Sequence, residues 1–76
     1  MREKYSDRLI KLGLTIAYYR KFKGLTQEQL AEKADIGRGH LGHIEAANMF
    51  TGVYVKTLYA IADALEISIT DLFDFK

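Results

Sequence analysis

The sequence predicts a small all-α domain of five short helices, and three observations support that prediction. Apolar residues recur at three- and four-residue spacing along most of the chain, which is the spacing of a helix with one buried face. Proline is absent from all 76 residues, and proline is the residue that helix interiors tolerate least. The length allows only one hydrophobic core. We therefore expect a single domain that spans residues 1–76.

The first predicted helix covers residues 6–23, with Ser6 as its N-cap and Gly24 as its stop signal. Its apolar residues repeat at intervals of three and four, so they should form one stripe that faces the core. The residues of this stripe are Leu9, Leu12, Ile16, Tyr19 and Phe22.

The second predicted helix, residues 27–34, begins at a specific start signal. The Thr26 side chain can accept a hydrogen bond from the backbone amide of Gln29, and the Gln29 side chain can accept one from the backbone amide of Thr26, as in a capping box. Asp35 follows as a turn residue that tolerates positive φ, and Ile36 should pack this turn onto the core. The inward residues of this helix are Leu30, Ala31 and Ala34.

The third predicted helix runs from about residue 37 to residue 46 and completes a helix-turn-helix over residues 26–46. Leu41 and Ile44 should face inward, and the small side chain of Ala31 lets the two helices approach closely. The outward positions are Arg38, Gly39, His40, Gly42 and His43. A helix held in this way can lie in a DNA major groove and offer its outward groups to the bases.

Two further helices complete the predicted fold. After a loop at residues 47–52, a fourth helix starts near Tyr54. Ser68 and Asp71 form a start signal for a short fifth helix, in which Leu72 and Phe73 should face inward. The inner stripe of the fourth helix is Leu58, Ile61, Ala62 and Leu65.

Charge is unevenly distributed along the chain. The net charge is +1, but residues 1–24 carry seven basic and two acidic side chains, a net +5, while residues 25–76 carry four basic and eight acidic ones, a net −4. This division allows a polyanion such as nucleic acid to meet one face of the molecule only. Two solvated helix faces explain it equally well.

No feature of the sequence indicates export or membrane insertion. The first five residues lack the apolar segment of a signal peptide. Uncharged runs, such as residues 12–19, are far shorter than the ~18–20 residues that a membrane span needs. Cysteine is absent, which fits a reducing compartment. We expect a cytoplasmic protein that contacts no membrane.

Catalysis and cofactor binding have little support in the sequence. The serines and threonines lack a nearby histidine–acid pair. The glycines of residues 37–42 spell G-x-G-x-x-G, but no strand precedes them, so they do not form a nucleotide-binding loop. His40 and His43 stand three apart and could ligate zinc, yet the nearest further ligand is Glu45, which has another expected role. We expect no enzyme activity, metal, cofactor or small-molecule ligand.

Three segments of the chain are informative about its family: LGLTIAYYRKFKGLTQEQLAEKADI, HLGHIE and TLYAIADALEISITDLF. In spacing and residue type they resemble the lambda-repressor/Cro-like, or XRE-type, helix-turn-helix family of transcriptional regulators, over residues 12–73. The resemblance implies five short helices, of which helices two and three form the reading unit. It also implies a DNA-binding repressor or activator, in most members a dimer.

The resemblance assigns DNA-binding roles to residues of the helix-turn-helix. Gln27 would hydrogen-bond a phosphate or support the base-reading side chains. Arg38 stands at the exposed N-terminal position that meets bases, where arginine suits bidentate contact with guanine. His43 matches another base-reading position, and His40 lies on the flank, where a phosphate contact is expected. Gly39 occupies a position that usually carries a reading side chain.

Residues outside the helix-turn-helix complete this assignment. The loop after Glu45 lacks the glycine and basic residues usual in the family, so phosphate contacts there would fall to backbone amides, Asn48 and Lys56. Arg20 and Glu45 match a structural ion pair that ties the first helix to the end of the third. Gly37 stands where the family favours a serine or threonine cap.

Two functions of different classes follow from these observations. The first is a sequence-specific regulator of transcription that binds double-stranded DNA: a dimeric repressor that inserts its third helix into the major groove of an inverted repeat and dimerises through its fourth and fifth helices. The second is a protein-interaction module, antitoxin-like or an accessory subunit, that keeps the fold but reads DNA weakly. The three glycines of residues 37–42 and the small net charge motivate the second. A regulator that senses metal through His40 and His43 is a third interpretation.

Overall fold

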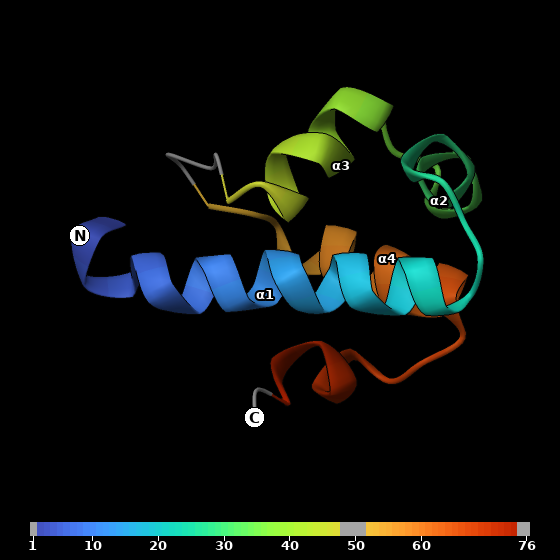
Figure 1. Cartoon of the computed structure of the whole chain (residues 1–76). Coiled ribbons are helices and arrows are strands. Elements are labelled where there is room, and N and C mark those ends of the chain that lie inside the picture. Colours follow the sequence, from blue (N-terminus) through green and yellow to red (C-terminus); the bar gives the residue numbers. More distant parts are fainter. Residues whose placement is uncertain (1, 48–51, 75–76) are drawn as a thin grey trace.

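The computed structural model describes residues 2–47 and 52–74, and within these ranges all regular structure is helical. The elements, in chain order, are α1 (Arg2–Phe22), α2 (Gln27–Ala34), α3 (Arg38–Glu45), α4 (Val55–Leu65) and η1 (Ile69–Phe73) (Figure 1). The predicted all-α class is confirmed, with the difference that the fifth helix is a short 3₁₀ helix rather than an α-helix.

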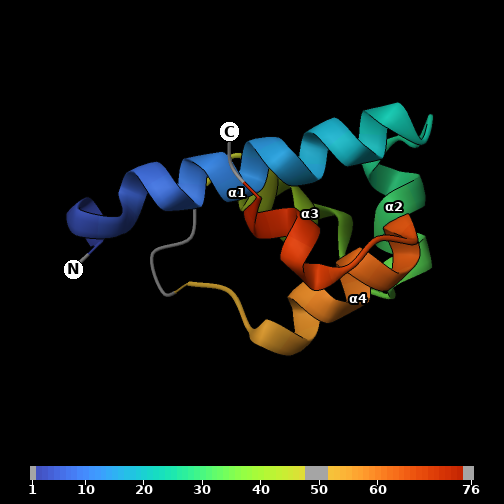
Figure 2. The ribbon, with the colours of Figure 1, turned by 90° about the horizontal axis from the view of Figure 1, so that it is seen from below.

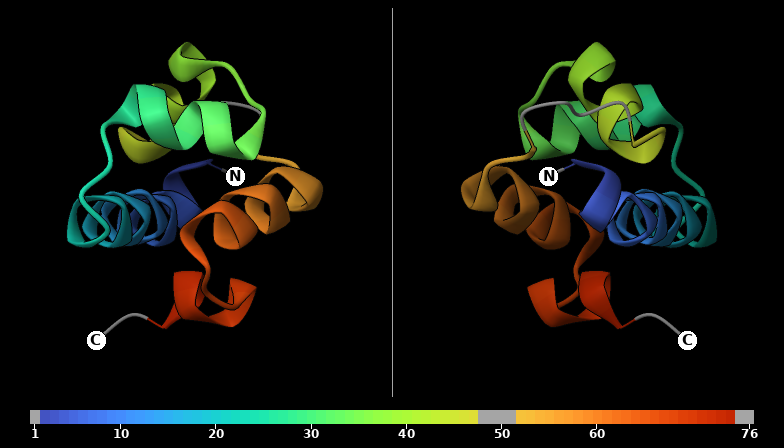
Figure 3. Two further views of the ribbon diagram at one scale, coloured as in Figure 1. Left: turned by 90° about the vertical axis from the view of Figure 1, so that its right-hand side faces the viewer. Right: turned by 90° about the vertical axis from the view of Figure 1, so that its left-hand side faces the viewer.

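The helices form three tiers, which Figure 3 shows from two sides. The upper tier holds α2 and α3, the middle tier holds α1 beside α4, and η1 lies beneath them. The most extensive contacts join α2 to α4, and α3 to both α1 and α2. Figure 2 shows that the N-terminal turns of α1 extend past the other helices. The two helices of the upper tier, α2 and α3, therefore pack on α4 and α1.

The core is formed by aliphatic side chains from all five elements. The fully or nearly fully buried residues are Leu12, Ile16, Leu30, Ala31, Ala34, Leu41, Ile44, Leu58, Ile61, Ala62, Leu65 and Leu72. All of them were predicted to face inward from the helical spacing. Three further predicted core residues, Leu9, Tyr19 and Ile36, are half-buried and pack against this cluster.

The local signals at the helix ends are confirmed in most cases. Thr26 and Gln29 form the predicted capping box at α2, with the Gln29 amide donating to the Thr26 hydroxyl over 3.1 Å. Ser68 and Asp71 form the corresponding box at η1. Asp35 adopts the left-handed conformation expected of it, with φ of 57°. These caps satisfy backbone groups that short helices leave without intrahelical partners.

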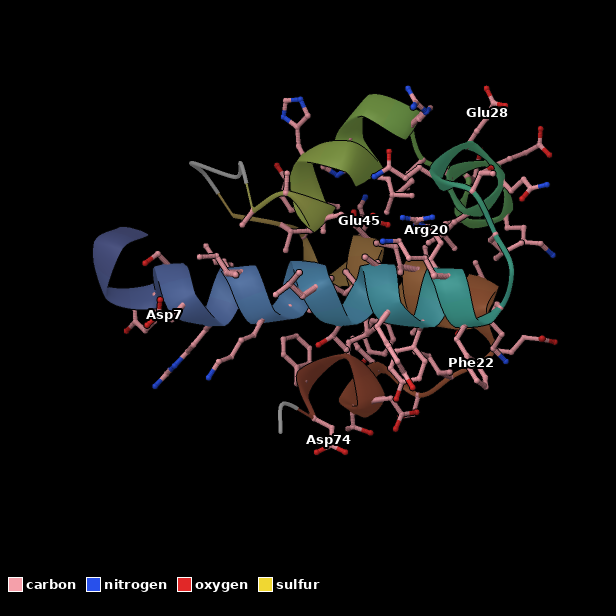
Figure 4. All side chains as sticks on the ribbon, in the orientation of Figure 1. Asp7, Arg20, Phe22, Glu28, Glu45 and Asp74 are labelled. Carbon is pink, nitrogen blue, oxygen red and sulfur yellow. The ribbon has the colours of Figure 1, made fainter. Side chains whose placement is uncertain are left out.

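Three predictions for the ends of the fold are wrong. Helix α1 begins at Arg2, so Ser6 lies inside the helix and is not its N-cap. Phe22 is exposed, because it is the last residue of α1 and lies on the side of the helix away from α2 and α3 (Figure 4). Phe73 is also exposed, because a 3₁₀ helix aligns residues three apart, and the inward face of η1 is occupied by Ile69 and Leu72.

Candidate nucleic-acid interface

One face of α3 is polar and open to solvent, while its opposite face belongs to the core. Leu41 and Ile44 are completely buried. Arg38, Gly39, His40 and His43 are all exposed, as predicted from the helical period. Gly42 was expected to face outward, but it is half-buried: a Cβ placed on it would lie 3.8 Å from the Gln27 side-chain oxygen. The outward face of α3 thus presents three side chains and one bare glycine.

The turn between α2 and α3 fixes the direction of this face. Asp35 in the left-handed conformation ends α2, and its amide and that of Ile36 donate to carbonyls of the last turn of α2, over 3.2 and 3.0 Å. The Ile36 side chain packs against the core. Gly37 then starts α3 without any side-chain cap. The turn is held by backbone hydrogen bonds and one apolar anchor, so α3 leaves α2 in a defined direction.

A part-buried polar cluster joins α1, α2 and α3 behind the exposed face. Arg20 of α1 donates from Nε to Glu45 Oε2 over 2.8 Å and from Nη2 to Glu45 Oε1 over 3.1 Å (Figure 4). Gln27 of α2 donates to the same Oε1 over 3.0 Å, and Arg20 Nη1 donates to the Leu25 carbonyl over 2.9 Å. The Arg20 and Glu45 side chains are only 11% and 6% exposed. We call Arg20, Gln27 and Glu45 the anchor cluster.

The anchor cluster explains why a charge pair is tolerated at this depth. The two Arg20–Glu45 hydrogen bonds are parallel and bidentate, the geometry in which guanidinium and carboxylate interact most strongly. Among the described residues, every buried side-chain nitrogen or oxygen has a hydrogen-bond partner. The cluster therefore carries no uncompensated charge, and it fixes the C-terminal end of α3 against α1. Gln27, for which two roles were expected, directs its amide nitrogen to Glu45.

A close backbone approach beside this cluster was missed by sequence reasoning. A Cβ at Gly13 of α1 would lie 2.5 Å from the Glu45 carbonyl oxygen and 2.6 Å from that of Ile44. Any larger residue would push α3 away from α1. The one available signal was a glycine inside a helical pattern, which costs about 1 kcal/mol relative to alanine and so invites a packing explanation.

An open hollow of about 480 Å³ lies where α2 begins and is lined by Arg20, Thr26, Gln27, Glu28 and Arg38. The start of a helix offers backbone N–H groups and the positive end of its dipole, so it favours an anion. Arg38 adds an exposed positive charge, since Arg20 is paired with Glu45. Glu28 places a carboxylate on the same hollow, which opposes an anion there. Neither Thr26 nor Glu28 was singled out as a candidate from the sequence.

The remaining predicted residues are dispersed around α3. His40 lines a small hollow of about 190 Å³ with Gly52, Val53 and Tyr54, so Tyr54 is a neighbour of α3. Lys56 is exposed in the first turn of α4, at a hollow that it shares with Asp35. Asn48 lies outside the described residues.

Other kinds of site find little basis in the described part of the chain. His40 and His43 are exposed, and no three histidine, cysteine, aspartate or glutamate side chains gather there in a way that could hold a metal ion. Within the same residues, every helix is too short or too polar to cross a membrane.

Two eight-residue helices across a short turn, with a buried apolar back and an exposed polar face on the second, define a helix-turn-helix domain. Residues 16–72 match the family model described as Helix-turn-helix. The chain belongs to this family, the XRE-type helix-turn-helix regulators, as its resemblance implied.

Relatives and solved structures of this type are similar over most of the chain. The transcriptional regulator SinR of Bacillus subtilis is 35% identical over 65 residues, which are 86% of this chain and 58% of SinR. The chain therefore spans little more than half of that relative. The restriction-modification controller protein C.AhdI of Aeromonas hydrophila superposes with a TM-score of 0.84 at 33% identity, over 91% of this chain and all of that one. A crystal structure of SinR in complex with DNA gives a TM-score of 0.74 at 35% identity, over 83% and 98% of the two chains.

Proposed function

We propose that this chain is a sequence-specific, double-stranded-DNA-binding regulator of transcription that inserts α3 into the major groove. The observation that carries the proposal is the exposed polar face of α3, whose back is fixed by Leu41, Ile44 and the anchor cluster. A rigidly mounted helix of this kind meets base edges at a fixed depth and angle. SinR, which is similar to this chain in sequence and fold, has been solved in complex with DNA, and this supports DNA binding as the function of the present chain.

In this proposal Arg38 and His43 read bases. Arg38 occupies the first turn of α3, fully on the solvent side, and its guanidinium can make two hydrogen bonds to guanine O6 and N7. His43 lies five residues further on the same exposed face. Gly39 stands between them with open space around its missing side chain, so the backbone of α3 can come close to the groove floor there.

Phosphate contacts surround this reading face. The hollow at the start of α2 is suited to one phosphate, with the helix amides as donors, Gln27 at its wall and the positive charge of Arg38 at its edge. His40 and Lys56 are exposed on either side of the turn into α4 and serve a second stretch of backbone. Asn48, in the same connection, is assigned to phosphate by its place in the sequence.

The proposal includes a homodimer that represses transcription from an inverted repeat. Two-fold symmetry would present two copies of α3 to successive turns of the major groove. Val55 and Tyr59, two exposed apolar residues of α4, support an interface formed by α4 and η1. We place this regulator in the cytoplasm, acting as one domain with its helix-turn-helix at residues 26–46.

Selection of duplexes from a random pool tests these proposals together. The expected result is an enriched inverted repeat whose half-sites are centred about one helical turn apart, which supports both the reading of bases and the dimer. Enrichment of a single half-site would keep the reading function and contradict the symmetric dimer. If no motif is enriched at low salt, α3 does not read DNA.

A protein-interaction module remains the second candidate because of one observation. The reading helix begins with three glycines in six residues, and the Cβ positions of Gly37 and Gly39 open into empty space, so α3 offers few specific groups. Salt separates the candidates. The logarithm of DNA affinity should fall by about 0.9 per phosphate contact for each unit of log salt concentration, whereas binding through an apolar protein interface should hardly change.

A further inference from the structure

Helix α1 has a second apolar face, which the core does not use. Ile10, Leu14, Tyr18 and Phe22 are 46%, 62%, 62% and 73% exposed. Their spacing of four residues places them in one row along the helix. The rings of Tyr18 and Phe22 stack with their centroids 6.3 Å apart, so the row is ordered at its C-terminal end. We call these four residues the α1 ridge.

The middle of the α1 ridge points away from the core of the domain. With 100° of rotation per residue, Ile10, Leu14 and Tyr18 lie on the side of α1 opposite Leu12 and Ile16, which are buried in the core, while Phe22 lies towards the edge of that side. Gly13, the contact point with α3, is also on the inner side. Figure 4 shows Phe22 on the side of α1 away from α2 and α3. A molecule bound to the ridge would therefore leave the outward face of α3 free.

An exposed row of this size calls for a partner. Single exposed apolar residues are ordinary, but contiguous apolar patches on a small domain usually mark an interaction surface. The row runs for about 18 Å along α1 at 1.5 Å per residue. Because the back of α1 is fixed in the core, the ridge cannot turn inward to hide these side chains.

The charges beside the ridge indicate the chemistry of that partner. Lys11 and Lys21 lie on the outward half of α1, one turn before Leu14 and one turn after Tyr18, and both are exposed. Arg8 is exposed one turn before Lys11, and Asp7 is the nearest acid on the same helix. An apolar row with basic flanks is complementary to an apolar row with acidic flanks.

The same charges oppose a second copy of this chain as the occupant. Two α1 helices could pack in an antiparallel register that pairs Ile10 with Phe22 of the other copy, and Leu14 with Tyr18. The same register brings Lys11 of one copy opposite Lys21 of the other. A parallel two-fold arrangement instead sets each lysine against its own counterpart. Either arrangement places like charges together beside the apolar contact, which disfavours association.

We propose that the α1 ridge is a docking surface for an acidic amphipathic helix of another protein. The row of residues four apart forms a ridge of the kind that interdigitates with a second helix, so the partner packs as a helix across α1. Its apolar residues bury Leu14 and Tyr18, and its carboxylates face Lys11 and Lys21. The domain then holds DNA and the partner protein on opposite sides, and the proposal does not depend on DNA reading.

The test uses a synthetic helical peptide of about 18 residues, which spans the ridge, with leucine at every fourth position and glutamates beside the leucine row. A control peptide carries lysines in place of the glutamates. Titration into the isotope-labelled protein, followed by NMR, should shift amide signals of α1 and leave those of α3 in place. The lysine peptide should bind at least about 10-fold more weakly, a difference of about 1.4 kcal/mol.

Variants of the protein sharpen the test. Leu14→Ala removes apolar area from an exposed position, so it should weaken peptide binding while the melting temperature and DNA affinity stay unchanged. Lys21→Glu should weaken binding of the glutamate peptide and improve binding of the lysine peptide. Lys33→Glu is the matched control: it makes the same charge change on the exposed surface of α2 and should have no effect.

Four results would overturn the proposal. They are no α1 shifts with the glutamate peptide, equal binding of both peptides, α1 shifts with phosphatidylglycerol vesicles but not with the peptide, and a loss of self-association in Leu14→Ala by sedimentation. The third would identify a membrane and the fourth a second copy as the occupant. Failure of duplex selection would leave the peptide result standing, so this proposal and the DNA proposal can fail separately.

Discussion

The short helix α3 has two sides, one at the junction with α1 and one that faces outward. The two sides differ in how many defined contacts their residues make. At the junction Gly13, Arg20, Gln27 and Glu45 all make defined contacts with another element. On the outward face, Gly39 has open space around it and the charged side chains are exposed. The difference teaches that the residues of α3 that hold the fold together are separate from those to which we assign the reading of DNA. Substitutions should therefore affect one property and spare the other.

The largest effect is expected at the centre of the junction. Glu45→Ala would leave Arg20 buried without its charge partner and remove the acceptor of Gln27, so the free energy of unfolding should fall by about 3–5 kcal/mol. Urea denaturation measures the change. Glu32→Ala, at an exposed position of α2, is the matched control and should stay within about 0.5 kcal/mol of the parent protein. Similar losses for both variants would contradict the role of the anchor cluster.

Two glycines give the next comparison, one from each region. Gly13→Ala would force a methyl group against backbone carbonyls of α3 and should destabilise the fold by about 2–3 kcal/mol. Gly39→Ala meets open space in a helix and should stabilise it by about 0.5–1 kcal/mol. Thermal and urea denaturation of both variants provide the measurement. If both substitutions changed the free energy of unfolding in the same direction, the two regions would not be distinct.

On the outward face the expected loss is in specificity. Arg38→Ala should lower affinity for a selected operator by about 1–3 kcal/mol more than affinity for a scrambled duplex. Its unfolding free energy should change by less than about 0.5 kcal/mol, since Arg38 is exposed. Fluorescence anisotropy with both duplexes measures the difference. Equal losses on the two duplexes would assign Arg38 to phosphate rather than to bases.

The smallest effect is expected at the hollow where α2 begins. Glu28→Gln removes a carboxylate beside the proposed phosphate position, so affinity for matched and scrambled duplexes alike should rise a few-fold, or less than about 1 kcal/mol. Glu32→Gln, on the same helix but not at the hollow, corrects for the change in net charge. An equal rise in both variants would show a long-range charge effect and no local phosphate contact.

Much of the fold could be predicted because it depends on local patterns. The buried residues of α2, α3 and α4 follow from the helical period, and the capping residues Thr26 and Ser68 mark their own helix starts. The exposure of Arg38, His40 and His43 follows from the same period once Leu41 and Ile44 are assigned to the core.

The features that escaped prediction depend on the packing of distant elements. Gly13 matters only because α1 crosses the end of α3, a contact between residues more than thirty positions apart in the chain. Phe22 was assigned to the core because α1 has apolar residues on two sides, and spacing alone does not say which row is buried. Base and phosphate roles depend on a DNA molecule, whose position no pattern in the sequence supplies.

The shortness of α2 and α3, eight residues each, has a consequence for cooperativity. Isolated helices shorter than about 12–15 residues are marginal in water, so neither helix persists without α1 and α4 behind it. The amide protons of Leu41 and Ile44 should exchange with solvent only when the whole domain opens, at the free energy of global unfolding. A peptide of residues 26–46 would thus be largely unstructured, and the outward face of α3 lasts only as long as the whole fold does.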